Sequence, residues 1–500
     1  MKDNRIMRRD ILECLLCHDA PCSSACAVTD PAKKLRSIWF DNEVQAAAGL
    51  PDELPCYKCA APCEEQCVKK GRVPIREIMI RLNEEVRPEA ETLPDSGINR
   101  LHTDICGIPL DNPYLLSSSV VSSNYDMCAR AFEAGWAGAV FKTVCSFDIH
   151  ETSPRFSAVN GDTGSFIGFK NIEQLSDKSV SENMDAVRRL KENYPDKAVI
   201  VSYMGQNERE WGELASVCEE SGADAVELNF SCPNMAEGGL GSDIGQIPDL
   251  VEKFTAAAKS NTNIPVLVKL TPNVAAMSEA AEAAMRGGAD GLAAINTIKS
   301  IMGVSPETYV SSPDVAGMSA VGGYSGNAVK PIALRFISEL CHNDKLNDLH
   351  VSAMGGIETW KDALEFILLG AGSVQVTTAV MKYGYRIIDD LKTGLERYLT
   401  DKGFANVNEA RGLAREFVSD TTDVLERDTI CFPMFDRQKC VGCGRCVISC
   451  LDGGHQALEF DNDRKVILNG KKCVGCHLCV LVCPQKAVSA GTKRIKKIKE

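Results

Sequence analysis

Short apolar runs alternate with longer amphipathic segments between residues 101 and about 425. The longer segments, such as YDMCARAFEAGW and ENMDAVRRLKENY, repeat apolar residues at the spacing of a helix with one buried face. The short runs are rich in β-branched residues and predict buried strands. Eight such runs occur, at residues 115–121, 138–144, 198–204, 225–230, 265–270, 291–296, 350–355 and 374–378. Eight strands alternating with helices favour an α/β fold with a closed TIM (β/α)8 barrel over an open doubly wound sheet.

The two ends of the chain differ from this middle in their cysteines. Of 23 cysteines, eight lie between residues 14 and 67 and eight between 440 and 483. The polar stretch NEEVRPEAETLPDSGINR separates the first group from the barrel and contains the helix breakers Pro88, Pro94 and Gly97. We therefore predict four segments: an α-helical iron–sulfur head at 1–83, a linker at 84–100, the barrel at 101–425 and a ferredoxin-like α+β domain at 426–500.

The C-terminal cysteines show the spacing CxxCxxCxxxC twice, and Pro484 follows the second copy. This is the bacterial two-cluster ferredoxin pattern, in which three closely spaced thiolates and one distant thiolate hold each 4Fe–4S cluster. Zinc also binds CxxC pairs, but two complete quartets favour iron–sulfur clusters. The expected ligand sets are Cys440, Cys443, Cys446 and Cys483 for one cluster, and Cys473, Cys476, Cys479 and Cys450 for the other.

The head has eight cysteines at less specific spacings. They are Cys14, Cys17, Cys22, Cys26, Cys56, Cys59, Cys63 and Cys67. Zinc stays an alternative for them. The ferredoxin pattern on the same chain favours iron–sulfur chemistry, and eight thiolates suffice for two cubanes. The prediction is thus four 4Fe–4S clusters in the whole chain.

Charge and hydropathy exclude several classes of protein. The formal net charge is −13, whereas nucleic-acid binding needs a basic face. We find no apolar run of membrane-spanning length and no apolar core of a signal peptide near the N-terminus. Because clustered thiolates suit a reducing compartment, we expect a cytoplasmic protein that binds neither nucleic acid nor membrane.

Reactive residues follow several of the predicted strands, where catalytic groups of such barrels stand. Lys142 and Lys269 are at strand ends, and two lysines at such positions favour an anionic ligand. Cys232, in ELNFSCPN, follows a strand among polar neighbours and suits the role of general acid or base beside a flavin. No GxGxxG follows a strand, so we expect no Rossmann site for NAD(P) or FAD. A flavoprotein with four clusters and no nicotinamide site must then exchange electrons with something else.

From about Asn112 to its ferredoxin module, the chain resembles the dihydropyrimidine dehydrogenase family. The segments that carry the resemblance include FKT, NIEQLSDKS, ELNFSCP, KLTPN, INTIKS, GGIETW, QVTT, KCVGCGRC and KCVGCHLC. They resemble the barrel-and-ferredoxin subunit of the bacterial enzymes and the C-terminal half of the mammalian enzyme. The head, through CLLCHDAPCSSAC, resembles the helical iron–sulfur domain that opens the mammalian enzyme. The resemblance implies FMN and reversible reduction of the 5,6 double bond of uracil or thymine.

The resemblance also assigns roles to residues at the barrel mouth. Cys232 matches the general acid that protonates the pyrimidine C5 while reduced FMN delivers hydride to C6. The matching FMN contacts are Ser117, Ser118, Lys142, Thr143, Lys269, Gly326, Gly355, Gly356, Thr377 and Thr378, of which the last four are expected near the phosphate. The matching substrate contacts are Asn171, Glu173, Asn229, Ser231, Asn296 and Thr297. Amides and one carboxylate suit the alternating N–H and C=O groups of a uracil ring.

For the head, the resemblance implies one ligand set of Cys14, Cys17, Cys22 and Cys67, and a second of Cys26, Cys56, Cys59 and Cys63. The mammalian enzyme has a glutamine ligand in its second cluster. The matching stretch IREIMIRL has none, so we expect four thiolates here. In the resembled enzymes the head precedes FAD and NAD(P) domains. Since it precedes the barrel here, we expect a separate FAD/NAD(P)H-binding subunit or ferredoxin as partner, within a homo- or hetero-oligomer.

Three other functions stay open. A dihydroorotate dehydrogenase shares the barrel, the FMN and an NxSCPN segment. Another cyclic amide could replace the pyrimidine base. In a different class, the chain could be an electron-transfer subunit whose barrel only relays. The ferredoxin module and the NIE segment favour pyrimidine bases, whereas Cys232 and its polar neighbours argue against a mere relay.

Overall fold

Eight parallel strands close into a barrel in the computed structural model, which describes residues 8–90, 99–161, 166–233 and 241–496. The barrel strands are β3 (Tyr114–Leu116), β4 (Gly138–Cys145), β7 (Ala198–Met204), β8 (Ala225–Asn229), β9 (Val266–Lys269), β10 (Gly291–Ala294), β13 (His350–Met354) and β14 (Ser373–Val376). They pair in chain order, and β14 pairs with β3 to close the ring. Each overlaps one predicted run, so the predicted (β/α)8 barrel is confirmed.

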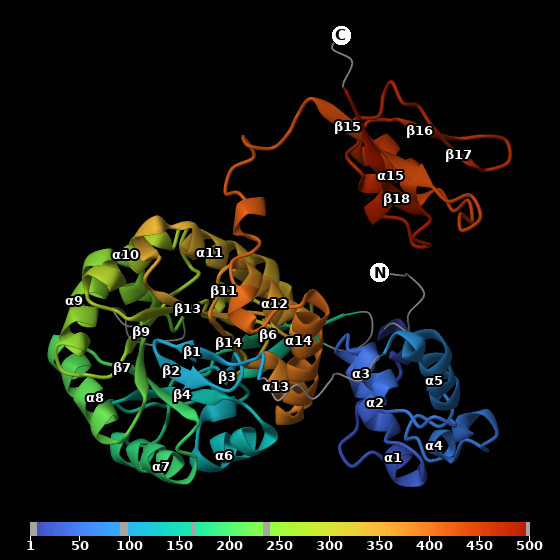
Figure 1. Cartoon of the computed structure of the whole chain (residues 1–500). Helices are drawn as coiled ribbons and strands as arrows, with labels where there is room; N and C mark the ends of the chain where they lie inside the picture. Colours follow the sequence, from blue (N-terminus) through green and yellow to red (C-terminus); the bar gives the residue numbers. More distant parts are fainter. Residues whose placement is uncertain (1–7, 91–98, 162–165, 234–240, 497–500) are drawn as a thin grey trace. The chain divides into compact units, whose positions relative to one another are not determined.

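An outer ring of helices surrounds these strands (Figure 1). The helices are α6 (Tyr125–Ala134), α7 (Val180–Asn193), α8 (Glu208–Glu220), α9 (Pro248–Lys259), α10 (Ser278–Arg286), α11 (Lys330–His342), α12 (Trp360–Leu369) and α14 (Ile388–Lys402). Local sequence fixes several of their starts. Ser179 and Glu182 form a reciprocal capping box at α7, and Thr359 and Asp362 form one at α12. A short helix, α13 (Thr378–Tyr383), stands between β14 and α14.

The first predicted strand is shorter than the apolar run that suggested it. β3 ends at Leu116, and the two valines of LLSSSVV belong instead to a 3-10 turn over Val120–Ser122. Serine hydroxyls compete for backbone hydrogen bonds, and Ser119 caps this turn together with Ser122. The early end of the strand leaves Ser117 and Ser118 at the carboxyl end of the barrel.

A four-stranded antiparallel sheet, which the sequence pattern did not predict, stands at the same end. Its order is β11 (Ile298–Ser300), β12 (Gly322–Ser325), β6 (Phe166–Asn171) and β5 (Phe156–Asn160). β5 and β6 are inserted between β4 and α7, and β11 and β12 between β10 and α11. At the other end of the barrel, the hairpin of β1 (Thr103–Ile105) and β2 (Ile108–Leu110) brings Cys106 Sγ to 3.5 Å from Asp290 O, next to the start of β10.

The head is helical and shares one hydrophobic core with the barrel. Its helices are α1 (Pro21–Ala25), α2 (Pro31–Trp39), α3 (Glu43–Ala48), α4 (Pro62–Glu65) and α5 (Ile75–Arg81). A π-helical turn over Leu82–Val86 and a 3-10 turn over Arg87–Glu89 continue α5, so part of the predicted linker is helical; residues 91–98 lie outside the described residues. Residues 1–418 form one compact unit and 419–500 a second.

The second unit has a small α+β fold of its own. β15 (Thr429–Phe435) pairs antiparallel with β18 (Val488–Lys496), and β16 (Leu458–Phe460) with β17 (Val466–Leu468). Two helices, α15 (Arg445–Gly453) and α16 (Leu478–Leu481), complete it. Its core includes Cys446 and Cys479. None of the helices in the described part of the chain is long and apolar enough to cross a membrane.

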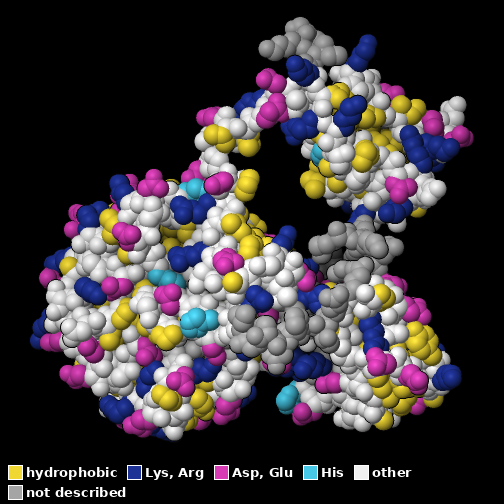
Figure 2. Space-filling model, in the orientation of Figure 1, with side chains coloured by type: hydrophobic (Ala, Val, Ile, Leu, Met, Phe, Trp, Pro, Cys, Tyr) yellow, Lys and Arg dark blue, Asp and Glu magenta, His cyan; other side chains and the backbone are white. Residues whose placement is uncertain are grey.

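Charges of both signs are mixed over the barrel surface that Figure 2 shows. Lys and Arg side chains stand among Asp and Glu side chains, so the coloured part of this face has no extended patch of one sign.

Candidate active site

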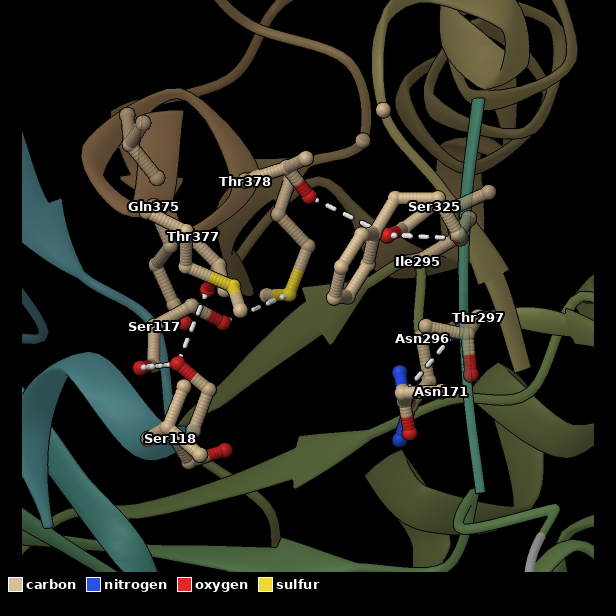
Figure 3. Close-up of a pocket in the computed structure, with 18 of the residues that line it drawn as sticks. Ser117, Ser118, Asn171, Ile295, Asn296, Thr297, Ser325, Gln375, Thr377 and Thr378 are labelled. Carbon is tan, nitrogen blue, oxygen red and sulfur yellow. Dashed lines mark hydrogen bonds between the residues drawn. The ribbon is translucent and has the colours of Figure 1, made fainter. Parts of the chain in front are cut away.

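A cavity of about 1120 Å³, counting the space open to solvent, lies at the carboxyl ends of the barrel strands. Every predicted FMN or substrate contact lines it except Ser231, and Cys232 lines it too. In Figure 3, Ser117, Ser118 and Thr377 lie on one side of the view, whereas Asn171, Asn296 and Thr297 lie on the other. Predicted cofactor contacts and predicted substrate contacts therefore line the same cavity.

A buried ion pair forms the charged floor of this cavity. Glu227 is fully buried, and its Oε1 lies 3.3 Å from Lys269 Nζ and accepts a hydrogen bond of 2.9 Å from Ser118 Oγ. Lys269 Nζ in turn donates to Ser118 Oγ at 2.8 Å. Gln375 Nε2 donates to Glu227 Oε2 at 3.3 Å. A ligand in the cavity would therefore contact a lysine whose charge is already balanced by Glu227, not an isolated cation.

A second cluster of charges stands at the side of the cavity. Lys142 Nζ lies 3.0 Å from Glu173 Oε1, and Arg155 Nη1 approaches the same oxygen at 3.2 Å. Arg155 also lies 3.7 Å from Glu151. Arg155 comes from the segment just before β5, and the sequence analysis assigned it no role. Glu173 therefore lies between two cationic side chains.

Amide and hydroxyl groups make a polar wall around Cys232. Asn229 Nδ2 donates to Thr143 Oγ1 at 2.9 Å, and Asn229 Oδ1 accepts from Ser231 Oγ at 2.8 Å. Ser231 Oγ also accepts from Asn296 Nδ2 at 2.8 Å. Ser231, a predicted substrate contact, therefore lies behind the wall and fixes two amides that line the cavity.

The turn after β13 contains two glycines that both the backbone conformation and close packing require. Gly355 has φ +127°, and a Cβ there would lie 2.7 Å from the Ala333 Cβ. Gly356 has φ +79°, and its Cβ would lie 2.9 Å from Gly326 O. Thr378, which also lines the cavity, begins α13 beside them. Exposed backbone at glycines beside threonine hydroxyls is a common phosphate cradle, so these residues fit the FMN phosphate.

Gln375 gives a second test of the fit to a flavin. Its Nε2 is held by Glu227 and by Ser352 Oγ at 3.2 Å, while its Oε1 is buried without a hydrogen-bond partner among the described residues. A buried acceptor of this kind is costly unless a ligand supplies a donor. The isoalloxazine ring of FMN carries an N–H, so the chemistry of the cavity fits the cofactor.

The head thiols form two groups of four. Burial raises the pKa of Cys14 to about 11, and the nearby thiols of Cys22, Cys17 and Cys67 add to the increase. Burial likewise raises the pKa of Cys63 to about 11, with contributions from its neighbours Cys26, Cys59 and Cys56. The structure thus brings together the two ligand sets that the family resemblance implies. Thiols this close repel one another as thiolates, and bound iron would relieve that repulsion.

The ferredoxin-like unit groups its thiols in the same way. Burial raises the pKa of Cys446, and nearby Cys483 and Cys440 add to the increase. For Cys473, burial is again the main cause, followed by Cys476 and Cys450 among its neighbours. Backbone N–H groups donate to three of these sulfurs: Cys450 from Ala457 at 3.3 Å, Cys473 from Gly475 at 3.4 Å and Cys483 from Ala487 at 3.2 Å.

Within the described ranges, no three His, Cys, Asp or Glu side chains are grouped closely enough to hold one metal ion. A 4Fe–4S cluster asks for a wider arrangement, because each thiolate binds a different iron.

Comparisons with known proteins place this architecture in a family. The dihydroorotate dehydrogenase profile matches residues 100–399, and the 4Fe-4S dicluster domain profile matches residues 434–490. The chain is 53% identical over 361 residues to the NAD-dependent dihydropyrimidine dehydrogenase subunit PreA of Escherichia coli (strain K12), covering 72% of this chain and 87% of that protein. It is 36% identical over 360 residues to the chloroplastic dihydropyrimidine dehydrogenase (NADP(+)) of Arabidopsis thaliana, covering 69% and 83%. It is 37% identical over 315 residues to the catalytic subunit of dihydroorotate dehydrogenase B (NAD(+)) of Pyrococcus abyssi, covering 63% and 99%.

Proposed function

Because this chain belongs to the dihydroorotate dehydrogenase family and carries a 4Fe–4S dicluster domain, we propose that it is the catalytic subunit of a flavin-dependent dihydropyrimidine dehydrogenase. It would reversibly reduce the 5,6 double bond of uracil or thymine. The observation that carries the proposal is the single cavity that gathers Cys232, a wall of amides and two paired lysines. The 53% identity to a subunit of that enzyme supports it.

The residues that would hold FMN all line the cavity. Ser117, Ser118, Lys142, Thr143 and Lys269 would contact its ring system and side chain. Gly326, Gly355, Gly356, Thr377 and Thr378 would surround its phosphate. Reduced FMN bound there would supply the hydride that C6 of the pyrimidine receives.

The remaining residues would bind the substrate and move its proton. The side chains of Asn171, Asn229, Asn296 and Thr297 offer both donors and acceptors to the alternating groups of the ring. Glu173, held between Lys142 and Arg155, would accept a hydrogen bond from a ring N–H. Cys232 would give its thiol proton to C5, so that one hydride and one proton convert the double bond into a single bond.

Electrons would reach this site through four 4Fe–4S clusters. Two would be held by the head at residues 1–83, and two by the domain at residues 426–500. The linker at 84–100 and the barrel at 101–425 lie between these two segments in the chain. The sequence motif for a Rossmann nucleotide site is missing, and the Escherichia coli relative is named as one subunit of an NAD-dependent enzyme. We therefore expect a separate FAD/NAD(P)H-binding subunit or ferredoxin to supply electrons at the head, in a homo- or hetero-oligomer in the reducing cytoplasm.

Dihydroorotate oxidation is the second candidate, because the family profile and the Pyrococcus abyssi relative carry that name. Orotate differs from uracil by a carboxylate, which asks for a cation free to bind it. Arg155 stands beside the cavity, but Glu173 and Glu151 already hold its guanidinium. This pairing favours the neutral pyrimidine bases.

The proposal is tested by anaerobic reduction of the purified chain with dithionite, followed by addition of uracil, thymine or orotate. Reoxidation of the flavin by uracil or thymine supports it, whereas reoxidation by orotate alone assigns the second candidate.

Cys232→Ala should keep the flavin and iron–sulfur absorbance and lose at least a hundredfold of the turnover, the usual scale of general acid catalysis. Cys106→Ala, at the opposite end of the barrel, is the matched control and should turn over like the wild type. Turnover by Cys232→Ala at the wild-type rate would refute the assignment of the acid.

A further inference from the structure

Arg386, a cationic residue of the barrel, reaches the head beside one of its two sets of four thiols. Arg386 lies in a 3-10 turn over Tyr385–Ile387, directly after α13. Its Nη2 donates to Leu16 O at 2.5 Å and its Nη1 to Cys17 O at 3.1 Å. Cys17 belongs to the thiol group with Cys14, Cys22 and Cys67. The guanidinium therefore stands at the loop that carries one of these four sulfurs.

Among the residues that the structure describes, Arg386 makes no direct ion pair of the kind that its neighbour Arg36 makes, although the charge of Asp390 also acts on it. Arg36, in the same cleft, is bound by Asp390 at 2.6 Å and by Asp389 at 3.5 Å. Arg386 gives all of its described hydrogen bonds to backbone carbonyls, the third being Nε to Tyr383 O at 3.2 Å. The other charged residues that border this cleft are Asp19, Asp30 and Lys33. Asp30 is held by Ser23 and by the start of α2.

We propose that Arg386 is a positioning residue that raises the reduction potential of the cluster held by Cys14, Cys17, Cys22 and Cys67. This inference rests on the proposed function, since it takes the four thiols as ligands of a 4Fe–4S cluster. Reduction adds one negative charge to such a cluster, and a cation nearby stabilises the reduced state. Hydrogen bonds from the guanidinium also polarise the peptide groups of the ligand loop in the same sense.

The consequence is that the barrel sets the potential of a cluster in the head. Cys59 offers a comparison within the same head, because Arg76 Nη1 donates to its backbone carbonyl at 3.1 Å. Arg76 belongs to α5 and is exposed, so solvent screens its charge. The cluster of Cys14, Cys17, Cys22 and Cys67, here called the seam cluster, thus depends on a partly buried cation from the barrel. The group of Cys26, Cys56, Cys59 and Cys63 has an exposed cation from within the head.

The test is an EPR-monitored redox titration of the full-length protein with its clusters and FMN in place. Cys17→Ser identifies the signal of the seam cluster as the one that is lost. In Arg386→Gln we expect the reduced-to-oxidised ratio of this cluster at a fixed potential to fall at least tenfold, which is about 59 mV for a one-electron couple. Arg386→Lys keeps the charge and should restore most of the potential. Arg76→Gln, the matched control, should leave the seam cluster unchanged.

The possible failures are distinguishable. About eight instead of about sixteen iron atoms per chain, with no EPR signal lost in Cys17→Ser, would refute the clusters of the head and with them the proposed function of that segment. A seam cluster that is present but keeps its potential in Arg386→Gln would overturn the inference alone. A potential that falls equally in Arg386→Gln and Arg386→Lys, or equally in Arg76→Gln, would also overturn it, because charge at position 386 would then not be the cause.

Discussion

Glu227 and Lys269 are the most deeply buried opposite charges of the active-site cavity. Glu227 has no exposed surface and Lys269 is 3% exposed, and their charged atoms lie 3.3 Å apart. Removing water from two such charges is expensive, and their attraction offsets the cost only while both are present. Ser118 and Gln375 add hydrogen bonds to the same carboxylate. The pair therefore supplies the cavity with a lysine whose charge is balanced by a carboxylate.

Replacement of this carboxylate should be severe. Glu227→Gln would leave Lys269 buried without its counter-charge, so we expect the barrel to lose about 3–5 kcal/mol of stability. A lower thermal midpoint in near-UV circular dichroism and a lower FMN content would measure the loss. Glu252→Gln breaks an exposed pair with Arg286 at 2.7 Å and is the matched control, with an expected cost under about 1 kcal/mol. Equal midpoints for the two variants would contradict the role given to Glu227.

His350 makes the barrel sensitive to acid. Its imidazole is buried at the start of β13 with Nε2 3.0 Å from Ser373 Oγ, and burial lowers its pKa from 6.5 to about 4. Below pH 6.5 the unfolded chain binds a proton that the folded barrel excludes, so stability is present above pH 6.5 and is lost as the pH falls to about 4. The shift corresponds to about 3 kcal/mol. Denaturant titrations across this pH range measure how steeply the free energy of unfolding falls with pH. We expect a shallower fall in His350→Gln than in the wild type, and an unchanged one in the exposed control His102→Gln. The same fall in all three proteins would show that His350 does not cause the acid sensitivity.

Sequence could identify the residues at strand ends but not which of them meet. Lys142, Lys269 and Cys232 stood out because reactive side chains after apolar runs are unusual, and all three line the cavity. Glu227 was hidden in the run AVELNF, where a single acid within a strand has no signal of its own. Arg155 directly precedes β5, in the insertion between β4 and α7. No local sequence pattern predicts where that insertion folds. Their roles arise from distances between elements far apart in the chain.

At the scale of single elements, the turn between β13 and α12 carries much of the predicted phosphate site. Gly356 combines φ +79° with a Cβ position 2.9 Å from Gly326 O and from the Lys330 backbone. In Gly356→Ala the strained φ and the clash should both push the turn out of place, so we expect at least a tenfold loss of FMN affinity, measured by flavin absorbance of the dialysed protein. Gly384→Ala is the matched control, since φ is +83° there and its Cβ would meet nothing within 4 Å. If both variants lost flavin to the same extent, the cause would be the positive φ that they share and not the clash of the new Cβ.

The barrel strands were predictable because they are buried on both faces and read as continuous apolar runs. β4 and β7, for example, are buried along their whole lengths. The antiparallel sheet of β5, β6, β11 and β12 was not predictable in this way. Its strands are partly exposed, and the pairing of β6 with β12 joins segments more than a hundred residues apart, so no continuous apolar run marks them in the sequence. Such insertions are held by tertiary contacts rather than by local preference.

At the scale of the whole molecule, the head behaves as part of the barrel unit. Sequence suggested a separate domain, because cysteine-rich and cysteine-poor segments meet at a polar stretch. In the structure α2 and α14 are joined by Asp390, which accepts hydrogen bonds from Arg36 Nε at 2.6 Å and from Ser37 Oγ at 2.7 Å. Asn42 Nδ2 adds a bond of 2.8 Å to Thr393 Oγ1. One hydrophobic core continues across this seam, so head and barrel should unfold together.

Asp390→Asn tests this joint unfolding. The substitution would leave Arg36 half-paired at a seam where Asp390 is 2% exposed, and we expect a cost of about 3–5 kcal/mol. If head and barrel form one cooperative unit, the near-UV signal of the barrel and the visible absorbance of the head clusters should shift to lower temperature by the same amount. Asp389→Asn, at a carboxylate 55% exposed and 3.5 Å from Arg36, is the matched control and should move neither signal by much. A shift of the cluster signal alone would show that the head unfolds independently, and Arg386 would then act across an interface that opens before the barrel does.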